Sequence, residues 1–179
     1  MLSALCAWGQ AHTSLPNAPL EVAVDFQAMR ANTVPGANFW TQGGGVQANA
    51  RITRHWGLSA DFSGQHTGTM PGSSAGLDLI TVLFGPRYTL TLPHRRFRIY
   101  GQALGGAAHG SNSVFPHSQG TTSSASGVAM LVGGGVDYPI SRHLAVRALD
   151  AAWLRTTFLN GTTTVQNNLR LGAGLVFRF

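Results

Sequence analysis

The sequence predicts an all-β protein, an eight-stranded antiparallel up-and-down barrel that crosses a membrane with strands. Two observations lead to this prediction. Residues 169–179 (LRLGAGLVFRF) carry apolar side chains at every second position, the period of a β-strand with one apolar face. Only 10% of the 179 residues are charged, well below the roughly 25% of soluble domains. Because no run of about 18 apolar residues offers a spanning helix, alternating strands are expected to face lipid.

The N-terminal residues 1–18 are expected to precede the barrel as the remnant of a signal peptide and a lead-in. Leu2 to Trp8 form a short apolar run followed by small residues, with Ala11 as a candidate cleavage position. The single cysteine, Cys6, excludes an intrachain disulfide, and the bulky Leu5 before it argues against a lipid anchor. Residues 19–179 are then one domain, the barrel.

Eight alternating segments of membrane-crossing length follow one another between turn signals. Along the chain they are 20–31, 38–52, 56–67, 77–91, 97–110, 125–138, 143–157 and 166–179. Short connections at 53–55, 92–96 and 139–142 alternate with longer ones at 32–37, 68–76, 111–124 and 158–165. Barrels with short periplasmic turns and longer outer loops show this alternation, and an even strand count brings both chain ends to the periplasmic side.

Each strand supplies at least one inward polar side chain if its alternating apolar residues face lipid. In the first strand, Val22, Val24 and Phe26 then face outward and Asp25 faces inward. In strand order, the inward polar residues are Asp25, Gln47 and Asn49, Asp61, Arg87, Gln102, Asp137, Arg147 and Arg170. The alternation breaks in the seventh strand around Leu149 and Asp150, so the facing there is left open.

Seven of these residues make up the candidate lumen network: Asp25, Asp61, Arg87, Gln102, Asp137, Arg147 and Arg170. An eight-stranded barrel has an interior only wide enough for side chains to fill. Charges buried there must be paired, because an unpaired buried charge is strongly destabilising. The sequence therefore predicts an arginine, carboxylate and amide network that plugs the lumen. A narrow porin-like channel for ions or small solutes is the alternative.

Glycine runs lie within the predicted strands at 43–45, 105–106 and 133–135. They lack the Lys-Ser/Thr pair and the helix of a phosphate-binding loop, so they indicate strand curvature and space for large neighbours. Aromatic residues near the strand ends are expected at the membrane boundaries. These are Trp40, Trp56, Tyr88, Tyr138, Trp153 and Phe158.

The formal net charge of +6 results from 12 arginines and six acidic residues, and the chain has no lysine. The arginines are dispersed along the chain, so no nucleic-acid partner is expected. Many basic residues gather beside the short turns and predict a basic periplasmic rim: Arg51, Arg54, His55, His94, Arg95, Arg96, Arg98, Arg142, His143 and Arg178. Anionic lipid head groups are the simplest partners for this rim. The histidine spacings match no metal motif, so neither metal nor cofactor is expected.

Six segments carry a resemblance to a known family: 84–88 (FGPRY), 100–104 (YGQAL), 133–137 (GGGVD), 143–147 (HLAVR), 166–170 (QNNLR) and 176–179 (VFRF). The chain resembles the eight-stranded outer-membrane β-barrel superfamily, which includes the transmembrane domain of outer-membrane protein A, and within it porin-family proteins of acidobacterial type. The resemblance implies an integral protein of the bacterial outer membrane with a structural or surface-interaction role. It also implies a membrane assembly signal formed by Leu171, Leu175, Phe177 and Phe179.

The partners implied by this resemblance are outer-membrane lipids, lipopolysaccharide and the barrel-assembly machinery, and the chain is expected to be a monomer. Two alternatives remain open. His109 and Ser111 have the His-x-Ser spacing of outer-membrane lipid A deacylases, but Glu21 is the only glutamate and belongs to the opposite end of the barrel. No enzymatic activity is therefore expected. A soluble lipocalin-like binding barrel would need the apolar faces turned inward.

Overall fold

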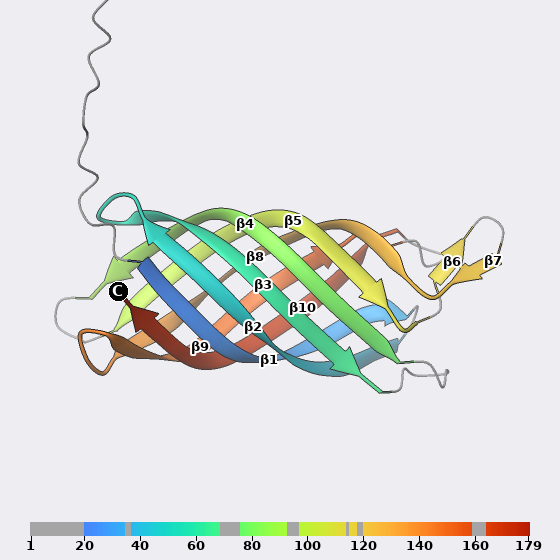
Figure 1. Cartoon of the computed structure of the whole chain (residues 1–179), viewed down its shortest axis with the longest axis horizontal. Helices are drawn as coiled ribbons and strands as arrows, with labels where there is room; N and C mark the ends of the chain where they lie inside the picture. The colour runs from blue at the N-terminus through green and yellow to red at the C-terminus, as the bar shows by residue number, and fades with distance from the viewer. Residues whose placement is uncertain are drawn as a thin grey trace, which may run out of the picture.

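A computed structural model of the chain describes residues 20–34, 37–68, 76–92, 97–113, 115–117, 120–158 and 164–179. The barrel strands are β1 (Leu20–Val34), β2 (Ala37–Arg51), β3 (Trp56–Thr67), β4 (Leu77–Thr91), β5 (Arg98–Ser111), β8 (Ala125–Pro139), β9 (Leu144–Thr156) and β10 (Gln166–Arg178). All pair antiparallel with their neighbours along the chain, and β1 pairs with β10, which closes an eight-stranded barrel (Figure 1). Among the described residues, no helix is long and apolar enough to cross a membrane.

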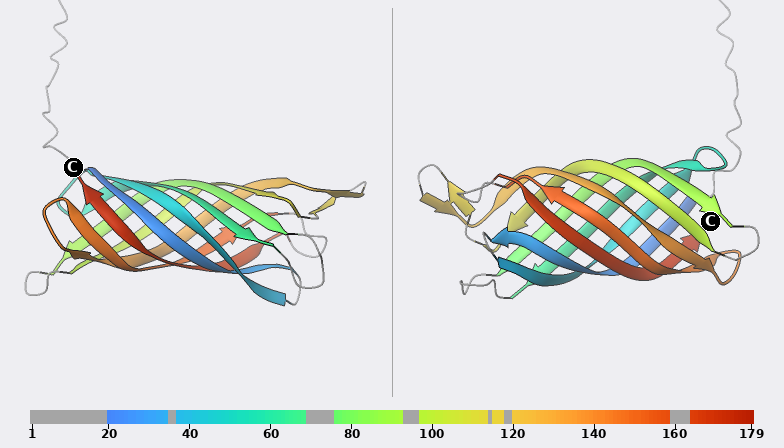
Figure 2. Two further views of the ribbon diagram at one scale, coloured as in Figure 1. Left: turned by 60° about the horizontal axis from the view of Figure 1, so that its bottom comes forward. Right: turned by 180° about the vertical axis from the view of Figure 1, so that it is seen from behind.

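A small hairpin interrupts the connection between β5 and β8. It consists of β6 (Phe115–His117) and β7 (Gly120–Thr122), which pair with each other and not with the barrel. The hairpin lies beyond the barrel end, opposite the end that holds Leu20 and Arg178 (Figures 1 and 2). Bacterial barrels keep their short turns in the periplasm, so we call the end with Leu20 and Arg178 the periplasmic end and the hairpin end the outer end.

The eight predicted strands are confirmed, and β3 and β4 have the predicted bounds. The prediction of a longer connection at 32–37 is wrong, because β1 continues to Val34 and β2 already begins at Ala37. Ala31 pairs with Phe39, and after a register shift Val34 pairs with Ala37. This irregular pairing extends the hairpin beyond the point where the apolar alternation stops. Short and long connections therefore do not alternate strictly.

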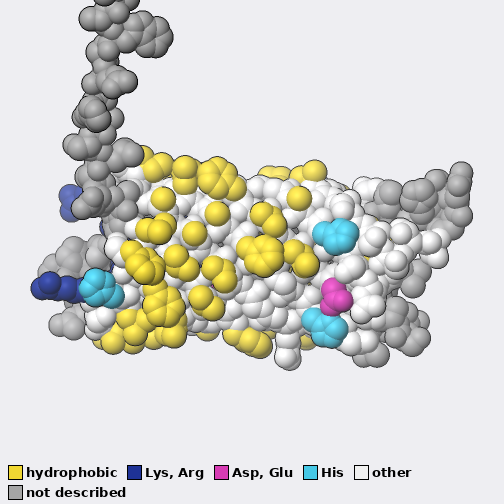
Figure 3. Space-filling view, in the orientation of Figure 1, with side chains coloured by type: hydrophobic (Ala, Val, Ile, Leu, Met, Phe, Trp, Pro, Cys, Tyr) yellow, Lys and Arg dark blue, Asp and Glu magenta, His cyan; other side chains and the backbone are white. Residues whose placement is uncertain are grey.

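Side chains alternate between lipid and lumen along the strands, as the sequence pattern predicts. In β1, Val24 and Phe26 are 50% and 63% exposed, whereas Asp25 between them is 5% exposed. The outward side chains form an apolar band between a basic end and a polar end (Figure 3). A lipocalin-like barrel has the reverse arrangement, with apolar side chains around an internal ligand. The exterior is therefore suited to lipid.

A β-bulge in β9 explains the uncertain facing around Leu149 and Asp150. Val136 of β8 pairs with Leu149 and Asp137 pairs with Arg147, so Ala148 is an extra residue on the β9 side. An extra residue shifts the alternation of the following side chains by one position. As a result Arg147 and Asp150 both face the lumen, although they are three residues apart.

The predicted aromatic boundary is present in part. Near the periplasmic end, Trp56 is exposed and packs edge-on against Tyr88 with a centroid distance of 5.0 Å. Tyr138 is also exposed there, and Trp40 and Trp153 are exposed in the outer half. Placing Phe158 in this girdle was wrong. Phe158 follows the end of β9 and turns inward, where it is 3% exposed.

The lipid-facing side chains provide a test of the barrel's exterior. Val82 lies near the middle of β4 and is 57% exposed. Val82→Arg is expected to lower the free energy of unfolding by about 2–4 kcal/mol, because it places a cation in the hydrocarbon core. Ser126→Arg, at the exposed second residue of β8 at the outer end, is the control and is expected to cost less than about 1 kcal/mol. Denaturant titrations in phospholipid vesicles would measure both values, and equal costs would contradict the assignment.

The lumen as candidate functional site

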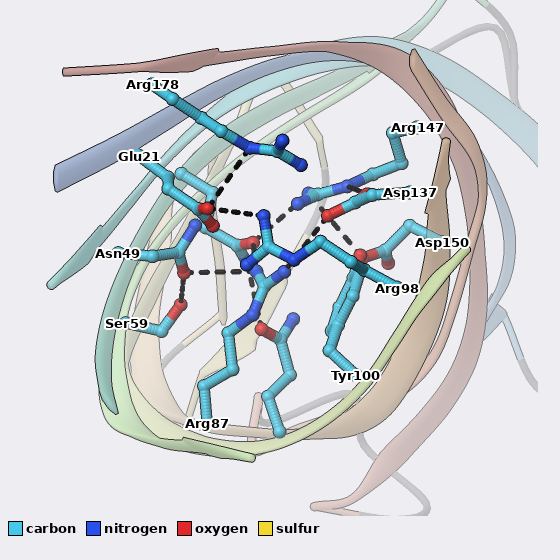
Figure 4. Close-up of polar contacts among 12 residues, drawn as sticks. Glu21, Asn49, Ser59, Arg87, Arg98, Tyr100, Asp137, Arg147, Asp150 and Arg178 are labelled. Carbon is cyan, nitrogen blue, oxygen red and sulfur yellow. Dashed lines mark hydrogen bonds and ion pairs between the residues drawn. The ribbon is translucent and has the colours of Figure 1, made fainter. Parts of the chain in front are cut away.

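Arg147 is the centre of the polar cluster in the lumen. Its side chain, from β9, is fully buried. Nε donates a hydrogen bond to Asp137 Oδ1 at 3.0 Å, and Nη1 donates to Asp25 Oδ2 at 2.9 Å and to Gln47 Oε1 at 3.1 Å. Asp150 Oδ2 lies 3.9 Å from Nη1. One guanidinium group therefore connects strands β1, β2, β8 and β9 across the barrel (Figure 4).

Arg87 of β4 binds the other side of the same cluster. Nη1 donates to Gln47 Oε1 at 2.8 Å and to Asn49 Oδ1 at 3.1 Å, and Nη2 lies 3.3 Å from Asp137 Oδ2. Asp137 thus accepts from two arginines, and Gln47 does the same with a single carbonyl oxygen. Removing either shared acceptor would therefore take one hydrogen-bond partner from both guanidinium groups.

The ring of Tyr100 on β5 lies against both arginines. The guanidinium carbon of Arg87 lies 3.5 Å from the centre of its ring, and that of Arg147 lies 4.8 Å away. The Tyr100 hydroxyl donates to Asp150. A methyl group at Gly135 would lie only 2.7 Å from the Tyr100 hydroxyl oxygen. Gly135 therefore provides the space that the ring needs, which agrees with the expectation for one of the glycine runs.

Arg170 and Asp61 form a second, separate ion pair. Nη1 and Nη2 of Arg170 donate to the two Asp61 oxygens at 2.9 and 3.0 Å, the bidentate geometry that makes such pairs strong. Nη1 also donates to Ser63 at 3.2 Å. Gln102 accepts from Gln47 Nε2 at 3.1 Å. All seven residues of the candidate lumen network are therefore buried in the lumen, in two groups.

Much of the outer half of the lumen is apolar, which the sequence reasoning missed. Leu104, Leu131 and Leu154 lie directly opposite one another on β5, β8 and β9 and are all buried. Phe115 and Phe158 lie above them from the outer connections, with ring centres 5.8 Å apart. The other buried members of this apolar cluster are Met29, Ala31, Phe39, Leu77, Leu79, Leu83, Ala108, Ala129 and Ala152. The sequence did carry one signal of this apolar part, because Leu77, Leu79 and Leu83 occupy inward-facing positions of β4.

Gly110 makes room for the aromatic part of this closure. A methyl group at Gly110 would lie 2.7 Å from Cζ of Phe115. The chain after β5 can therefore return over the barrel end and place Phe115 against the apolar cluster. The expectation that a polar network threads the whole lumen is corrected by this arrangement, because polar pairing dominates the periplasmic half and apolar packing dominates much of the outer half.

Glu21 forms ion pairs with three arginines at the periplasmic end of the lumen. Its Oε1 lies 2.5 Å from Arg98 Nη1, 3.3 Å from Arg178 Nε and 3.4 Å from Arg51 Nη2. These arginines belong to the predicted basic rim, together with the exposed Arg142 and His143. His94, Arg95 and Arg96 of that rim lie outside the described residues. His55 stacks on Tyr88 at a ring distance of 5.7 Å.

The structure does not assemble the His109 and Ser111 pair. His109 Nδ1 lies 2.8 Å from the hydroxyl of Ser126 on the neighbouring strand, not from Ser111. Asp78 lies opposite Ser111, but it contacts His66 at 2.5 Å. All these side chains are on the outer surface near the outer end. In the part of the chain that the structure describes, no group of three histidine, cysteine or acidic residues is placed to hold a metal ion.

The residues of the expected assembly signal lie on the lipid side of β10 or just after it. Leu175, Phe177 and Phe179 are exposed, and Leu171 is half-buried. They share one face of the strand, as the alternation predicts. Their role in assembly stays a prediction.

The closed barrel, its apolar exterior and its charged lumen define an integral outer-membrane β-barrel protein. The chain belongs to the family described as outer membrane protein beta-barrel domain, whose model matches residues 1–179. The expected superfamily and the expected location in the bacterial outer membrane are thereby confirmed. A comparison with curated proteins found no match.

Several solved structures share this fold. Neisserial surface protein A is 15% identical with a TM-score of 0.68, covering 89% of this chain and 97% of that one. Ail, the attachment invasion locus protein of Yersinia pestis in complex with the heparin analogue sucrose octasulfate, is 16% identical with a TM-score of 0.61, covering 90% and 99%. Outer membrane protein OprG from Pseudomonas aeruginosa is 11% identical with a TM-score of 0.53, covering 90% and 96%. At such identities the likeness concerns the fold.

Proposed function

We propose that this protein is a closed barrel that holds surface-exposed segments in the outer membrane and acts through them, not through transport. The observation that carries this proposal is the filled lumen. Arg147 and Arg170 are buried with their carboxylate partners, and Leu131 and Leu154 close the outer half. An eight-stranded barrel packed in this way has no continuous water path.

The internal pocket beside the Arg87 cluster is small. A pocket between Glu21, Asn49 and Arg87, reaching from the periplasmic end, has a volume of about 20 Å³. That volume holds about one water molecule. A hydrated ion or a sugar would have to separate the Arg87 and Arg147 ion pairs and then the leucine row. This observation favours the plugged lumen over the narrow porin-like channel.

Liposome swelling tests this closure for small solutes. Vesicles that contain the folded protein are expected to swell in isosmotic arabinose at the rate of protein-free vesicles. Vesicles with a general porin at the same protein-to-lipid ratio provide the positive control. Swelling above the protein-free rate would favour the channel alternative.

The outer end supports a role in surface interaction. Two proteins of the same fold carry such roles in their names, a surface protein and an attachment protein bound to a heparin analogue. In this chain the β6 and β7 hairpin projects beyond the barrel (Figure 2). It is connected to the barrel through the buried Phe115, so its position is tied to the apolar cluster. The hairpin is the described segment best placed to reach a partner.

An adhesion assay tests the hairpin directly. A Gram-negative host that produces the protein is expected to adhere to extracellular matrix more than the vector control does. Replacing residues 116–121 with a Gly-Ser segment of equal length keeps Phe115 and should remove the gain. Equal surface amounts of both proteins have to be shown by antibody labelling. Adhesion equal to the vector control in both cases would reject the surface role.

Lipopolysaccharide is proposed as the lipid partner of the outer half. Arg30 of β1 and Arg155 of β9 face outward there, with Trp40 and Trp153 nearby on the exterior. Guanidinium groups at this boundary can bind lipid phosphates. Undiminished lipopolysaccharide copurification after Arg30→Ala and Arg155→Ala would contradict this lipid contact.

The protein is also proposed to be a monomer that the barrel-assembly machinery inserts. Light scattering of the purified protein measures its mass, and the mass of a dimer would contradict the proposed monomer.

A further inference from the structure

The periplasmic mouth of the barrel holds a basic pocket that the closed lumen and the surface role do not use. Its volume is about 330 Å³. It is lined by Glu21, Arg51, Thr91, Arg98, Arg142, His143, Arg178 and Phe179. Four guanidinium groups therefore surround one side-chain carboxylate among these lining residues.

Glu21 cannot neutralise this group of arginines. Arg51, Arg98 and Arg178 all approach the same oxygen, Oε1. The Arg98 side chain is only 7% exposed, so its positive charge is held away from water. Nη2 of Arg178 is buried and has no hydrogen-bond partner among the described residues. Arg142 is exposed at the pocket wall and forms no ion pair with a described acidic residue. The pocket thus has an excess of cationic donors.

An apolar pocket continues from the basic one. It has a volume of about 430 Å³ and shares Thr91, Arg98 and Arg142 with it. Its other lining residues are Leu92, Pro139, Ile140 and Ser141. Leu92 and Ile140 are 40% and 57% exposed, so two apolar side chains at the rim are free to contact a ligand.

The depth of the combined site corresponds to the membrane surface. Tyr138, next to the apolar pocket in sequence, is exposed and packs against Phe97 with ring centres 5.4 Å apart. Aromatic residues at strand ends mark the boundary between hydrocarbon and water in such barrels. The basic arginines also lie at this end of the apolar band (Figure 3).

We infer that this mouth is a binding site for a phosphate-bearing anion, with the phosphate among Arg98, Arg142 and Arg178 and any apolar part of the ligand beside Leu92 and Ile140. Guanidinium groups match phosphate oxygens with paired N–H donors. The excess of positive charge disfavours a neutral or zwitterionic ligand. The phosphate can come from an anionic phospholipid of the inner leaflet or from a soluble phosphate compound, and the site does not depend on the proposed surface role.

Binding can be measured with the full protein folded in uncharged detergent micelles. The probes are inorganic phosphate, short-chain phosphatidylglycerol and short-chain phosphatidylcholine, titrated while arginine side-chain NMR signals are followed. Phosphatidylglycerol is expected to bind, and phosphatidylcholine is expected to bind at least about tenfold more weakly because its net charge is zero. Arg142→Gln should weaken phosphatidylglycerol binding about tenfold, since it removes one charge-assisted contact. Arg155→Gln, at the outer end, is the matched control.

Ile140→Ser distinguishes the two sources of phosphate. If the ligand is a lipid, this variant weakens phosphatidylglycerol binding and leaves inorganic phosphate unchanged. If the ligand is soluble, inorganic phosphate binds as tightly as the lipid and Ile140→Ser changes neither. Identical migration of the unboiled and the boiled protein on a gel would reveal a variant that has not folded, and Arg142 is chosen because its exposed position makes folding insensitive to it. Absence of binding by all probes, or equal binding in Arg142→Gln and Arg155→Gln, would overturn the inference.

Discussion

Arg147→Met is expected to lower the free energy of unfolding by about 3–5 kcal/mol. Arg147 is fully buried and is the partner of both Asp25 and Asp137 at 2.9 and 3.0 Å. Methionine fills much of the same volume but leaves Asp25 without its ion pair and Asp137 with Arg87 alone. The cost arises from the uncompensated buried negative charge, because a complete pair contributes little net stability. Urea titration of the protein in phospholipid vesicles, followed by tryptophan fluorescence, measures the change.

Two further variants separate charge from packing at this position. Combining Arg147→Met with Asp25→Asn removes the carboxylate that has lost its ion pair, while Asp137 keeps Arg87 at 3.3 Å, and is expected to recover much of the lost stability. Arg155→Met removes an exposed arginine of the same strand and is expected to change the free energy of unfolding by less than about 1 kcal/mol. A loss below about 1 kcal/mol for Arg147→Met would show that the central cluster is not held by this arginine.

Leu131→Ala is expected to cost about 2–5 kcal/mol of unfolding free energy. Leu131 is fully buried, with Leu104 opposite on one side and Leu154 on the other. Shortening the central member of this row removes apolar contacts and leaves a cavity that the rigid barrel wall cannot close. The same urea titration applies.

Leu169→Ala is the matched control for the leucine row. Leu169 is 45% exposed on the lipid side of β10, so the same truncation there creates no enclosed cavity. Its cost is expected to be smaller by about 1–3 kcal/mol. Equal losses at Leu131 and Leu169 would mean that the outer half of the lumen is not tightly packed.

The strands and their facing were predictable from the sequence because lipid imposes a strict two-residue period. Phe26 and Asp25 illustrate this: adjacent residues of opposite polarity can only be satisfied on opposite faces of the wall. Which buried side chains form ion pairs with each other could not be predicted in this way. That Arg147 would bind both Asp25 and Asp137 depends on the register of four strands and on the β9 bulge, neither of which the period encodes.

The sequence also does not show at what height along the barrel axis a lumen residue lies. Leu104, Leu131 and Leu154 were not recognised as one layer, because only the register places them opposite each other. Phe158 was misplaced for a related reason, since it lies beyond the last regular residue of β9, where the alternation no longer applies. The sequence pattern predicted only a loop at 111–124, whereas in the structure Phe115 packs against Phe158 in the buried apolar cluster at the outer end.

Planar-bilayer recording of the purified, folded protein tests whether the lumen is closed to ions, as we propose. With insertion verified by the amount of membrane-bound protein, the bilayer current is expected to stay at the level of the protein-free membrane across the applied voltages. That result follows from the buried Arg147 and Arg170 pairs and from the leucine row. Stable, stepwise openings in the nanosiemens range would contradict the closed lumen.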